Sequence, residues 1–290
     1  MEYALSNEQL SIVVSTRGAE LQSIKSGGVE YLWNGDPTYW ADRSPLLFPF
    51  VGRFTDGQYV FEGSAYTMNI HGFARAKEFL VIKQSADCLG LMLADDAETY
   101  SSYPFYFVLK IWYTLKKNCV QIKYQVENTS DKTLYFGLGG HPGFNVPLEE
   151  GLAFTDYHLE FAGKHTPSRV GHTESCFLSG CDTPFPLEDG YKLPLEHTLF
   201  DEDAIVLKNV ADSVMLKSNK GTRSVTVTYP KLPYLGLWHA PRTDAPYLCI
   251  EPWTSLPSRQ GIVEDFQYKG DLIRLHAKAV YENQWEIAIE

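Results

Sequence analysis

The sequence has 290 residues and a formal net charge of −11 at pH 7, and 44% of its residues are hydrophobic. This acidic balance, without any cluster of lysine and arginine, argues against a nucleic-acid-binding surface, because phosphate binding depends on clustered positive charge. We therefore predict no nucleic-acid partner, and the hydrophobic fraction is sufficient for a substantial core.

Nothing in the sequence indicates secretion or membrane insertion. The N-terminus lacks the basic flank and apolar run of a signal peptide, and no window has the length of apolar sequence needed to cross a bilayer. The five cysteines are scattered, without a Cys-x-x-Cys pair, a usage typical of reduced thiols. We predict a cytoplasmic protein with no membrane partner, no disulfide framework and no structural zinc.

Alternation of apolar and polar residues predicts β-strands along most of the chain. The predicted strands cover residues 10–14, 78–83, 89–94, 105–115, 120–126, 225–229 and 285–289. Clusters of Gly, Pro, Asn and Asp separate them, and one short helical pattern runs from about Asp95 to Ser102. No composition shift or low-complexity linker divides the sequence. These features predict an all-β sandwich or barrel and a single domain of residues 1–290.

The segment 136–145 surrounds one histidine, His141, with glycines and places Pro142 directly after it. Glycine permits a positive φ or a close approach of the backbone, and proline stops a helix from continuing. We expect a rigid, non-helical edge that holds His141 at the lip of a cleft. The spacing nearly fits a dinucleotide-binding fingerprint, but Pro142 stands at the third glycine position and no helical pattern follows.

Four other segments also place polar side chains between glycines, prolines and aromatic residues: 43–53, 70–75, 235–241 and 248–253. In the first, two prolines argue against a central strand, and Arg53 is better placed than Arg43 to reach into a pocket. In the last, an apolar strand carries Glu251, and we expect Pro252 to end it. A carboxylate on such a strand is unusual unless it is paired or used.

Several kinds of chemistry are compatible with these residues. Two histidines and Glu251 could form a zinc or iron triad, but no His-x-His or His-Glu-x-x-His pair supports it. No Gly-x-Ser-x-Gly elbow indicates a serine hydrolase, and a glycosidase would usually need a second carboxylate. An acid–base pair of His and Glu in an aromatic cleft suits a sugar, since aromatic rings cover its apolar face and polar groups bind its hydroxyls.

Taken together, four motifs resemble the aldose 1-epimerase (galactose mutarotase-like) family. In chain order they are Arg43-x-Pro45-x-Leu47-Phe48-Pro49-x-x-Gly52-Arg53, His71-Gly72-Phe73-Ala74-Arg75, Gly140-His141-Pro142-Gly143-Phe144 and Ile250-Glu251-Pro252-Trp253. The LacX-like branch is the most similar. The resemblance covers essentially the whole chain and implies a large antiparallel β-sandwich of one domain, with a sugar cleft across one curved sheet. It also implies that no metal or organic cofactor is required.

The resemblance assigns a role to individual residues. His141 corresponds to the general acid of the family and Glu251 to its general base, while His71 contacts the sugar near its ring oxygen. Arg53 corresponds to an arginine that binds hydroxyls.

Two further roles leave alternatives open. The acidic sugar ligand of the family matches Asp201 or Asp203, and the stacking aromatic residue matches Trp238 or Phe144.

The substrate also stays open at this point. In hexose-6-phosphate mutarotases of the family, arginines hold the phosphate, and Arg75 with Arg43 or Arg53 could do so here. Equally, Arg75 could form a structural ion pair. The expected partner is thus a small aldose or aldose phosphate. A non-catalytic sugar-binding or sensing protein and, third, a glycoside hydrolase are the competing hypotheses, and the sequence does not predict the oligomeric state.

Overall fold

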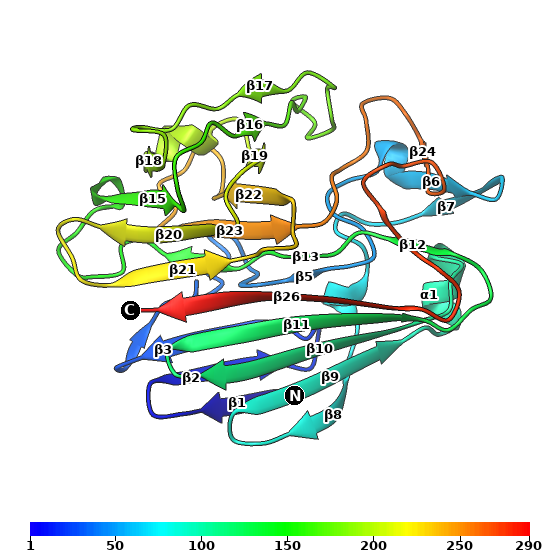
Figure 1. The fold of residues 1–290 in the computed structure, drawn as a ribbon, viewed down its shortest axis with the longest axis horizontal. Coiled ribbons are helices and arrows are strands. Elements are labelled where there is room, and N and C mark those ends of the chain that lie inside the picture. Colours follow the sequence, from blue (N-terminus) through cyan, green and yellow to red (C-terminus); the bar gives the residue numbers. More distant parts are fainter.

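The computed structural model describes residues 1–290 and is nearly all-β, with strands arranged in five sheets (Figure 1). Its one α-helix is α1 (Ala97–Ser102), and its 3₁₀ turns are η1 (Thr55–Gly57), η2 (Ala74–Ala76), η3 (Phe154–Asp156) and η4 (His197–Phe200). Helix α1 begins where Asp96 accepts a hydrogen bond from the Thr99 backbone N–H, as an N-cap residue does. The helix predicted near residues 95–102 is confirmed. None of the helices is long and apolar enough to span a membrane.

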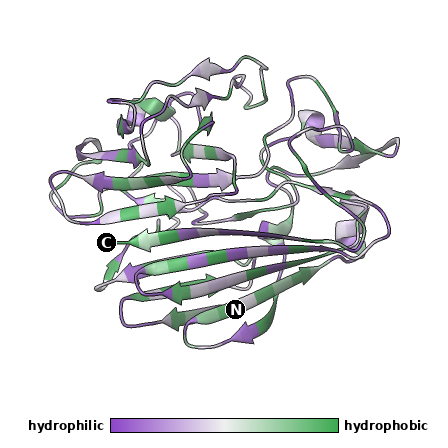
Figure 2. Ribbon diagram, in the orientation of Figure 1, coloured by the Kyte–Doolittle hydropathy of each residue, from purple (hydrophilic) through white to green (hydrophobic).

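The largest sheet has nine antiparallel strands. Their order is β18 (Lys192–Pro194), β15 (Tyr157–Phe161), β20 (Ser213–Ser218), β21 (Ser224–Thr228), β26 (Val280–Ile289), β11 (Cys119–Asn128), β10 (Phe107–Lys116), β9 (Cys88–Ala94) and β8 (Leu80–Gln84). Along β11, Val120, Ile122 and Tyr124 are buried while the residues between them are partly exposed. Figure 2 shows this banding along the long strands of the sheet. The predicted strand 120–126 is therefore confirmed.

The second large sheet has eight strands and carries most of the motif residues. Its order is β17 (Thr183–Pro184), β16 (Ser168–Arg169), β19 (Ile205–Lys208), β22 (Tyr234–Trp238), β23 (Tyr247–Trp253), β13 (Gly139–Gly140) and β5 (Leu46–Leu47), and β14 (Gly143–Asn145) also pairs with β23. Strand β5 lies at the end of this order, in agreement with the expectation that the proline-rich segment avoids the sheet centre.

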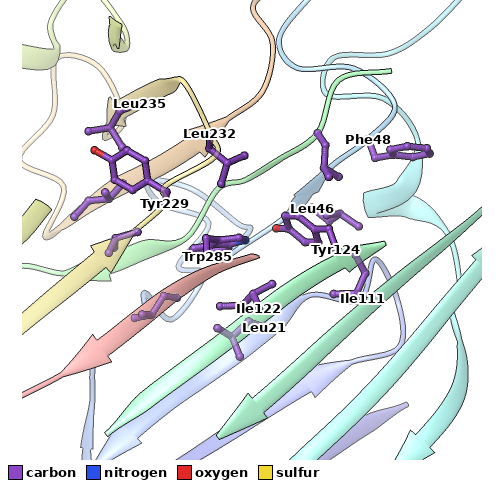
Figure 3. Close-up of a cluster of buried hydrophobic side chains, with 14 of the residues drawn as sticks. Leu21, Leu46, Phe48, Ile111, Ile122, Tyr124, Tyr229, Leu232, Leu235 and Trp285 are labelled. Carbon is purple, nitrogen blue, oxygen red and sulfur yellow. The ribbon is translucent and has the colours of Figure 1, made fainter. Parts of the chain in front are cut away.

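The main core lies between the two large sheets. One cluster of 64 buried hydrophobic residues includes Ile122 and Trp285 of the nine-stranded sheet together with Leu235 and Leu46 of the eight-stranded sheet. Figure 3 shows these side chains converging between the sheets. The predicted antiparallel β-sandwich is therefore confirmed.

Three smaller sheets extend the sandwich. They are formed by β1 (Glu2–Ser6), β2 (Leu10–Ser15), β3 (Leu21–Ser26) and β4 (Val29–Glu30); by β24 (Glu264–Asp265), β6 (Gln58–Phe61) and β7 (Ser64–Thr67); and by β12 (Leu134–Phe136) and β25 (Ile273–Leu275).

Strand β23 is buried on both of its faces, and this determines where the site lies. Leu248 and Ile250 point into the main core, whereas the alternate residues Cys249 and Trp253 belong to smaller clusters on the opposite face. Because successive side chains of a strand point to opposite sides, Glu251 shares the face of Cys249 and Trp253. The eight-stranded sheet thus presents Glu251 away from the sandwich core.

Candidate active site

A cavity of about 290 Å³ lies on this outer face of the eight-stranded sheet. Seven of the ten candidate residues that the sequence singled out for the site line it: Arg53, His71, Arg75, His141, Asp203, Trp238 and Glu251. They come from segments far apart in the chain, since β22 carries Trp238, β23 carries Glu251, the 3₁₀ turn η2 carries Arg75 and loops carry the others. The fold therefore brings the predicted motifs to one place.

His141 lies in the break between β13 and β14, and the pairing of Gly139 with Trp253 and of Gly143 with Cys249 places it opposite Glu251 on the neighbouring strand. The backbone N–H groups of Ile250 and Thr254 donate to Pro142 and Leu138 across this side of β23. Pro252 lies midway between these two donors, and because proline has no N–H, β23 donates no hydrogen bond to this side at that one position. The expectation that Pro252 ends the strand is wrong, because β23 continues to Trp253.

The glycines before His141 are needed for close packing. None of Gly137, Gly139 and Gly140 has a positive φ. A Cβ atom on Gly139 would lie 2.7 Å from Cδ1 of Trp253, and one on Gly140 would lie 2.6 Å from Cζ2 of Trp285. Glycine is therefore required at these two positions because tryptophan rings fill the space that a Cβ atom would occupy, and not because of a positive φ.

His141 and Glu251 lie side by side in the lining of the cavity. Their side chains are 11% and 1% exposed, and Nε2 of His141 lies 3.1 Å from Oε2 of Glu251. Trp40 stacks on the imidazole, with ring centroids 4.9 Å apart and an interplanar angle of 29°. Nδ1 of His141, Oε2 of Glu251 and Nε1 of Trp253 are buried without hydrogen-bond partners. Such atoms are costly to leave unpaired, so their gathering beside a cavity is typical of a ligand site.

Burial shifts the pKa values of this pair in opposite directions. It raises the pKa of Glu251 well above its ordinary value, and the nearby Asp203 adds to the effect. It lowers the pKa of His141 well below its ordinary value, and His71 and Arg75 add to that shift. Although a carboxylate beside a histidine ordinarily raises the histidine pKa, desolvation is the larger effect at His141.

His71 occupies a strained backbone position beside the cavity. Its φ is +64°, in the left-handed region that side chains rarely adopt. The Gly52 N–H donates to Nδ1 of His71 over 3.1 Å. Burial, with Arg75 and Arg53 adding to it, lowers the pKa of His71 to about 3. The ring is therefore neutral with Nδ1 as acceptor, which leaves its proton on Nε2.

Of the two candidate aspartates, Asp203 lines the cavity and Asp201 does not. The Asp203 carboxylate accepts one hydrogen bond from the Ala204 N–H at Oδ1, over 2.8 Å, and one from the Cys176 thiol at Oδ2, over 3.0 Å. These two contacts hold the carboxylate at the cavity wall.

The placement of Phe144 and Arg43 in the site is wrong. Phe144 on β14 pairs with Leu248 and is fully buried in the main core, so it cannot stack on a ligand. Nη1 of Arg43 donates to the Gln22 carbonyl over 2.7 Å, outside the cavity. Arg75 lines the cavity and pairs with Asp42, which fulfils the alternative of a structural ion pair.

Sequence reasoning missed several lining residues: Trp40, His172, Cys176, Glu202 and Trp253. Trp253 could have been found, because it stands two residues after Glu251 on an extended strand and therefore shares its face. Trp40 and Cys176 lie in loops, and no spacing in the sequence relates them to His141.

One group of side chains near the cavity has the composition of a metal site. Ligand atoms of His141, Cys249 and Glu251 all lie within 4.8 Å of one another, and all three residues are buried. The sequence did not single out these three residues together, because Cys249 and Glu251 lie on β23 while His141 lies in a loop more than a hundred residues earlier in the chain.

Comparison with known proteins agrees with this geometry. The family model described as "Aldose 1-epimerase" matches residues 1–286. Protein LacX of Lactococcus lactis subsp. lactis, in its plasmid form, is 35% identical over 266 residues, which cover 88% of each chain.

Two solved structures are similar over the whole chain. A galactose mutarotase related enzyme from Lactobacillus acidophilus has a TM-score of 0.95 at 30% identity, covering 100% of this chain and 97% of the other. A galactose mutarotase-like protein from Lactobacillus casei has a TM-score of 0.95 at 31% identity, covering 100% of both chains. By its family match, its relatives and its fold, this chain belongs to the aldose 1-epimerase family, among the relatives of LacX.

Proposed function

We propose that this protein is an aldose 1-epimerase that interconverts the α and β anomers of a neutral aldohexose. The observation that carries the proposal is the buried pair of His141 and Glu251, whose nearest side-chain atoms lie 3.1 Å apart beside a cavity with unpaired polar atoms. Acid–base chemistry needs two such groups, whereas simple binding does not. The family membership supports an isomerase, and the names of the two similar structures suggest galactose as a first substrate to test.

The proposed reaction opens and recloses the sugar ring. Glu251 takes the proton of the C1 hydroxyl while His141 donates a proton to the ring oxygen, and the bond between C1 and that oxygen breaks. Rotation about the C1–C2 bond presents the other face of the carbonyl. The ring closes as Glu251 returns its proton and His141 regains one, so the pair again holds one proton. This sequence requires the proton of the pair to be on His141 before each turnover, with its Nε2 3.1 Å from Oε2 of Glu251.

The other lining residues fit supporting roles. His71 carries its proton on Nε2 and can donate a hydrogen bond to the sugar without adding charge. The exposed Arg53 and the fixed carboxylate of Asp203 supply a donor and an acceptor for hydroxyl groups. Trp238 contributes an aromatic wall, with its ring centroid 5.8 Å from that of His141. We propose that Trp238 stacks on the sugar.

A hexose 6-phosphate is the competing substrate. Arg53 and Arg75 both line the cavity, but Asp42 pairs with Arg75, and Glu202 and Asp203 line the same cavity. A phosphate would meet these carboxylates as well as the arginines, so the charge balance favours a neutral sugar. A sugar-binding protein without catalytic activity is the competing hypothesis of another class.

Polarimetry on freshly dissolved α-D-galactose, α-D-glucose and glucose 6-phosphate tests the proposal. Glu251→Gln and His141→Asn should each lower the rate by roughly 10²- to 10⁴-fold, the usual contribution of one proton-transfer group. His158→Asn is the matched control, because the His158 and Glu160 side chains form a second His–Glu contact, 3.0 Å apart, outside the cavity. Sugar binding without any acceleration by the wild type would establish the non-catalytic alternative.

A further inference from the structure

We propose that Cys249, His141 and Glu251 form a buried site for a borderline-soft divalent cation such as Zn²⁺, and that the bound cation inhibits the enzyme. Binding of the cation is independent of the proposed function, whereas inhibition rests on it. The thiol of Cys249 has no part in the proposed ring opening. As a metal ligand it would add a third donor atom to those of His141 and Glu251.

The backbone places the three ligand atoms together. Cys249 and Glu251 are alternate residues of β23, so both side chains project from the face that carries the cavity. Nε2 of His141 approaches Oε2 of Glu251 to 3.1 Å from the neighbouring loop. Tetrahedral zinc with bonds of 2.0–2.3 Å requires ligand atoms about 3.3–3.8 Å apart. The 3.1 Å between Nε2 of His141 and Oε2 of Glu251 is close to this range. The widest separation among the three ligand atoms, at most 4.8 Å, must shorten by about 1 Å when the cation binds.

An unpaired atom already points to a ligand at this place. Oε2 of Glu251 is buried without a hydrogen-bond partner, and the side chain of Glu251 is 1% exposed. His141 and Glu251 line the cavity, so a cation can reach them from solvent and keep a fourth position open toward it. One nitrogen, one oxygen and one sulfur ligand match the preferences of Zn²⁺ and exclude Mg²⁺ and Ca²⁺, which take oxygen.

Charge balance also favours a divalent cation in this dry site. A thiolate and a carboxylate carry two negative charges, and with a neutral imidazole they cancel the charge of Zn²⁺. The buried complex is therefore neutral overall, which limits the desolvation cost of its parts. Burial, with Glu251 adding to it, raises the pKa of the Cys249 thiol. The cation must displace that proton, so binding should weaken as the pH falls. Once bound to the cation, neither His141 nor Glu251 is free to exchange a proton with a sugar.

Titration with Co²⁺ tests the site directly, because a thiolate bound to cobalt gives a charge-transfer absorption band. The wild type should bind one equivalent with this band, and Cys249→Ala should lose the band and bind more than about tenfold more weakly. Cys176→Ala is the matched control, since its thiol lines the same cavity outside the group and its loss should leave the band intact. Cys249→Ser, which has nearly the same shape, replaces Cys249→Ala if that variant does not fold.

Inhibition is measured separately with Zn²⁺ in the anomerisation assay. The wild type should lose activity on addition of Zn²⁺, and Cys249→Ala should keep its basal activity and need more than about tenfold more Zn²⁺ for the same loss. An unchanged cobalt band in Cys249→Ala, or no binding by the wild type at equimolar Co²⁺, would overturn the site. If no anomerisation is seen but the cobalt band depends on Cys249, the metal site holds and only the proposed function fails.

Discussion

His239, which does not line the cavity, should make the stability of this protein depend on pH. Its side chain is fully buried, and its Nε2 lies 3.2 Å from Nδ1 of His197. Burial lowers the pKa of His239 to about 4, and His197 adds to the effect, while the Ala240 carbonyl and Asp201 partly offset it. The ordinary value is 6.5, so the unfolded chain takes up this proton first as the pH falls.

The sign and size of the effect follow from linkage. A histidine whose folded pKa is depressed contributes its full stability above the unfolded value of about 6.5 and loses it as the pH falls below that value. The loss approaches about 1.4 kcal/mol per pH unit, and by pH 5 it amounts to about 2 kcal/mol. At pH values below about 4, where both states are protonated, the total loss is about 3 kcal/mol.

Urea unfolding followed by tryptophan fluorescence between pH 8 and pH 5 measures this dependence. His239→Gln cannot be protonated, so its stability should fall less steeply, and its difference from the wild type should shrink by about 2 kcal/mol over this range. The exposed His276 provides the control, and His276→Gln should follow the wild-type curve. The reasoning fails if His239→Gln loses stability with pH as steeply as the wild type does.

Other substitutions separate core residues from cavity residues. Phe144→Ala should lower the free energy of unfolding in urea by about 3–5 kcal/mol because it empties a fully buried position. Trp238→Ala should mainly raise KM. A raised KM with unchanged stability in Phe144→Ala would contradict the structure. Gly140→Ala places a methyl group 2.6 Å from a tryptophan ring carbon, so it should cost about 1–3 kcal/mol and lower kcat, and a silent substitution would contradict the packing argument. Arg53→Gln should raise KM while Arg43→Gln leaves it unchanged, and the reverse order would contradict the assignment of the cavity.

The sequence predicts much of this fold because period-two alternation is a local signal. Val120 to Val126 alternate strictly with polar residues, and β11 contains them with the predicted face buried. Which face of a strand meets which layer is not local, however. Phe144 and Trp238 look equivalent in sequence, but Phe144 pairs with Leu248 and points into the core. The pairing with β23 separates their roles. Phe144 on β14 lies opposite Leu248, on the core face, whereas Trp238 on β22 lies opposite Cys249, on the cavity face.

The site was predictable where a motif kept its residues in one short segment. His71, His141 and Glu251 each stand in such a segment, and the fold brings all three to the cavity. Trp40 and Cys176 reach it through loops whose course depends on distant contacts, such as the hydrogen bond between Cys176 and Asp203. The direction of the His141 pKa also required the structure, because it depends on how completely the fold removes water from the pair.

The most direct test of the acid–base account is magnetisation transfer between the two anomeric proton signals of galactose at equilibrium, with and without the protein. Exchange at equilibrium requires no net reaction, so it detects ring opening and closing alone. The account predicts rapid transfer with the wild type and near-complete loss with Glu251→Gln, while the variant still binds the sugar. Equal transfer with both proteins, or none above the spontaneous rate with the wild type on any aldose, would contradict it.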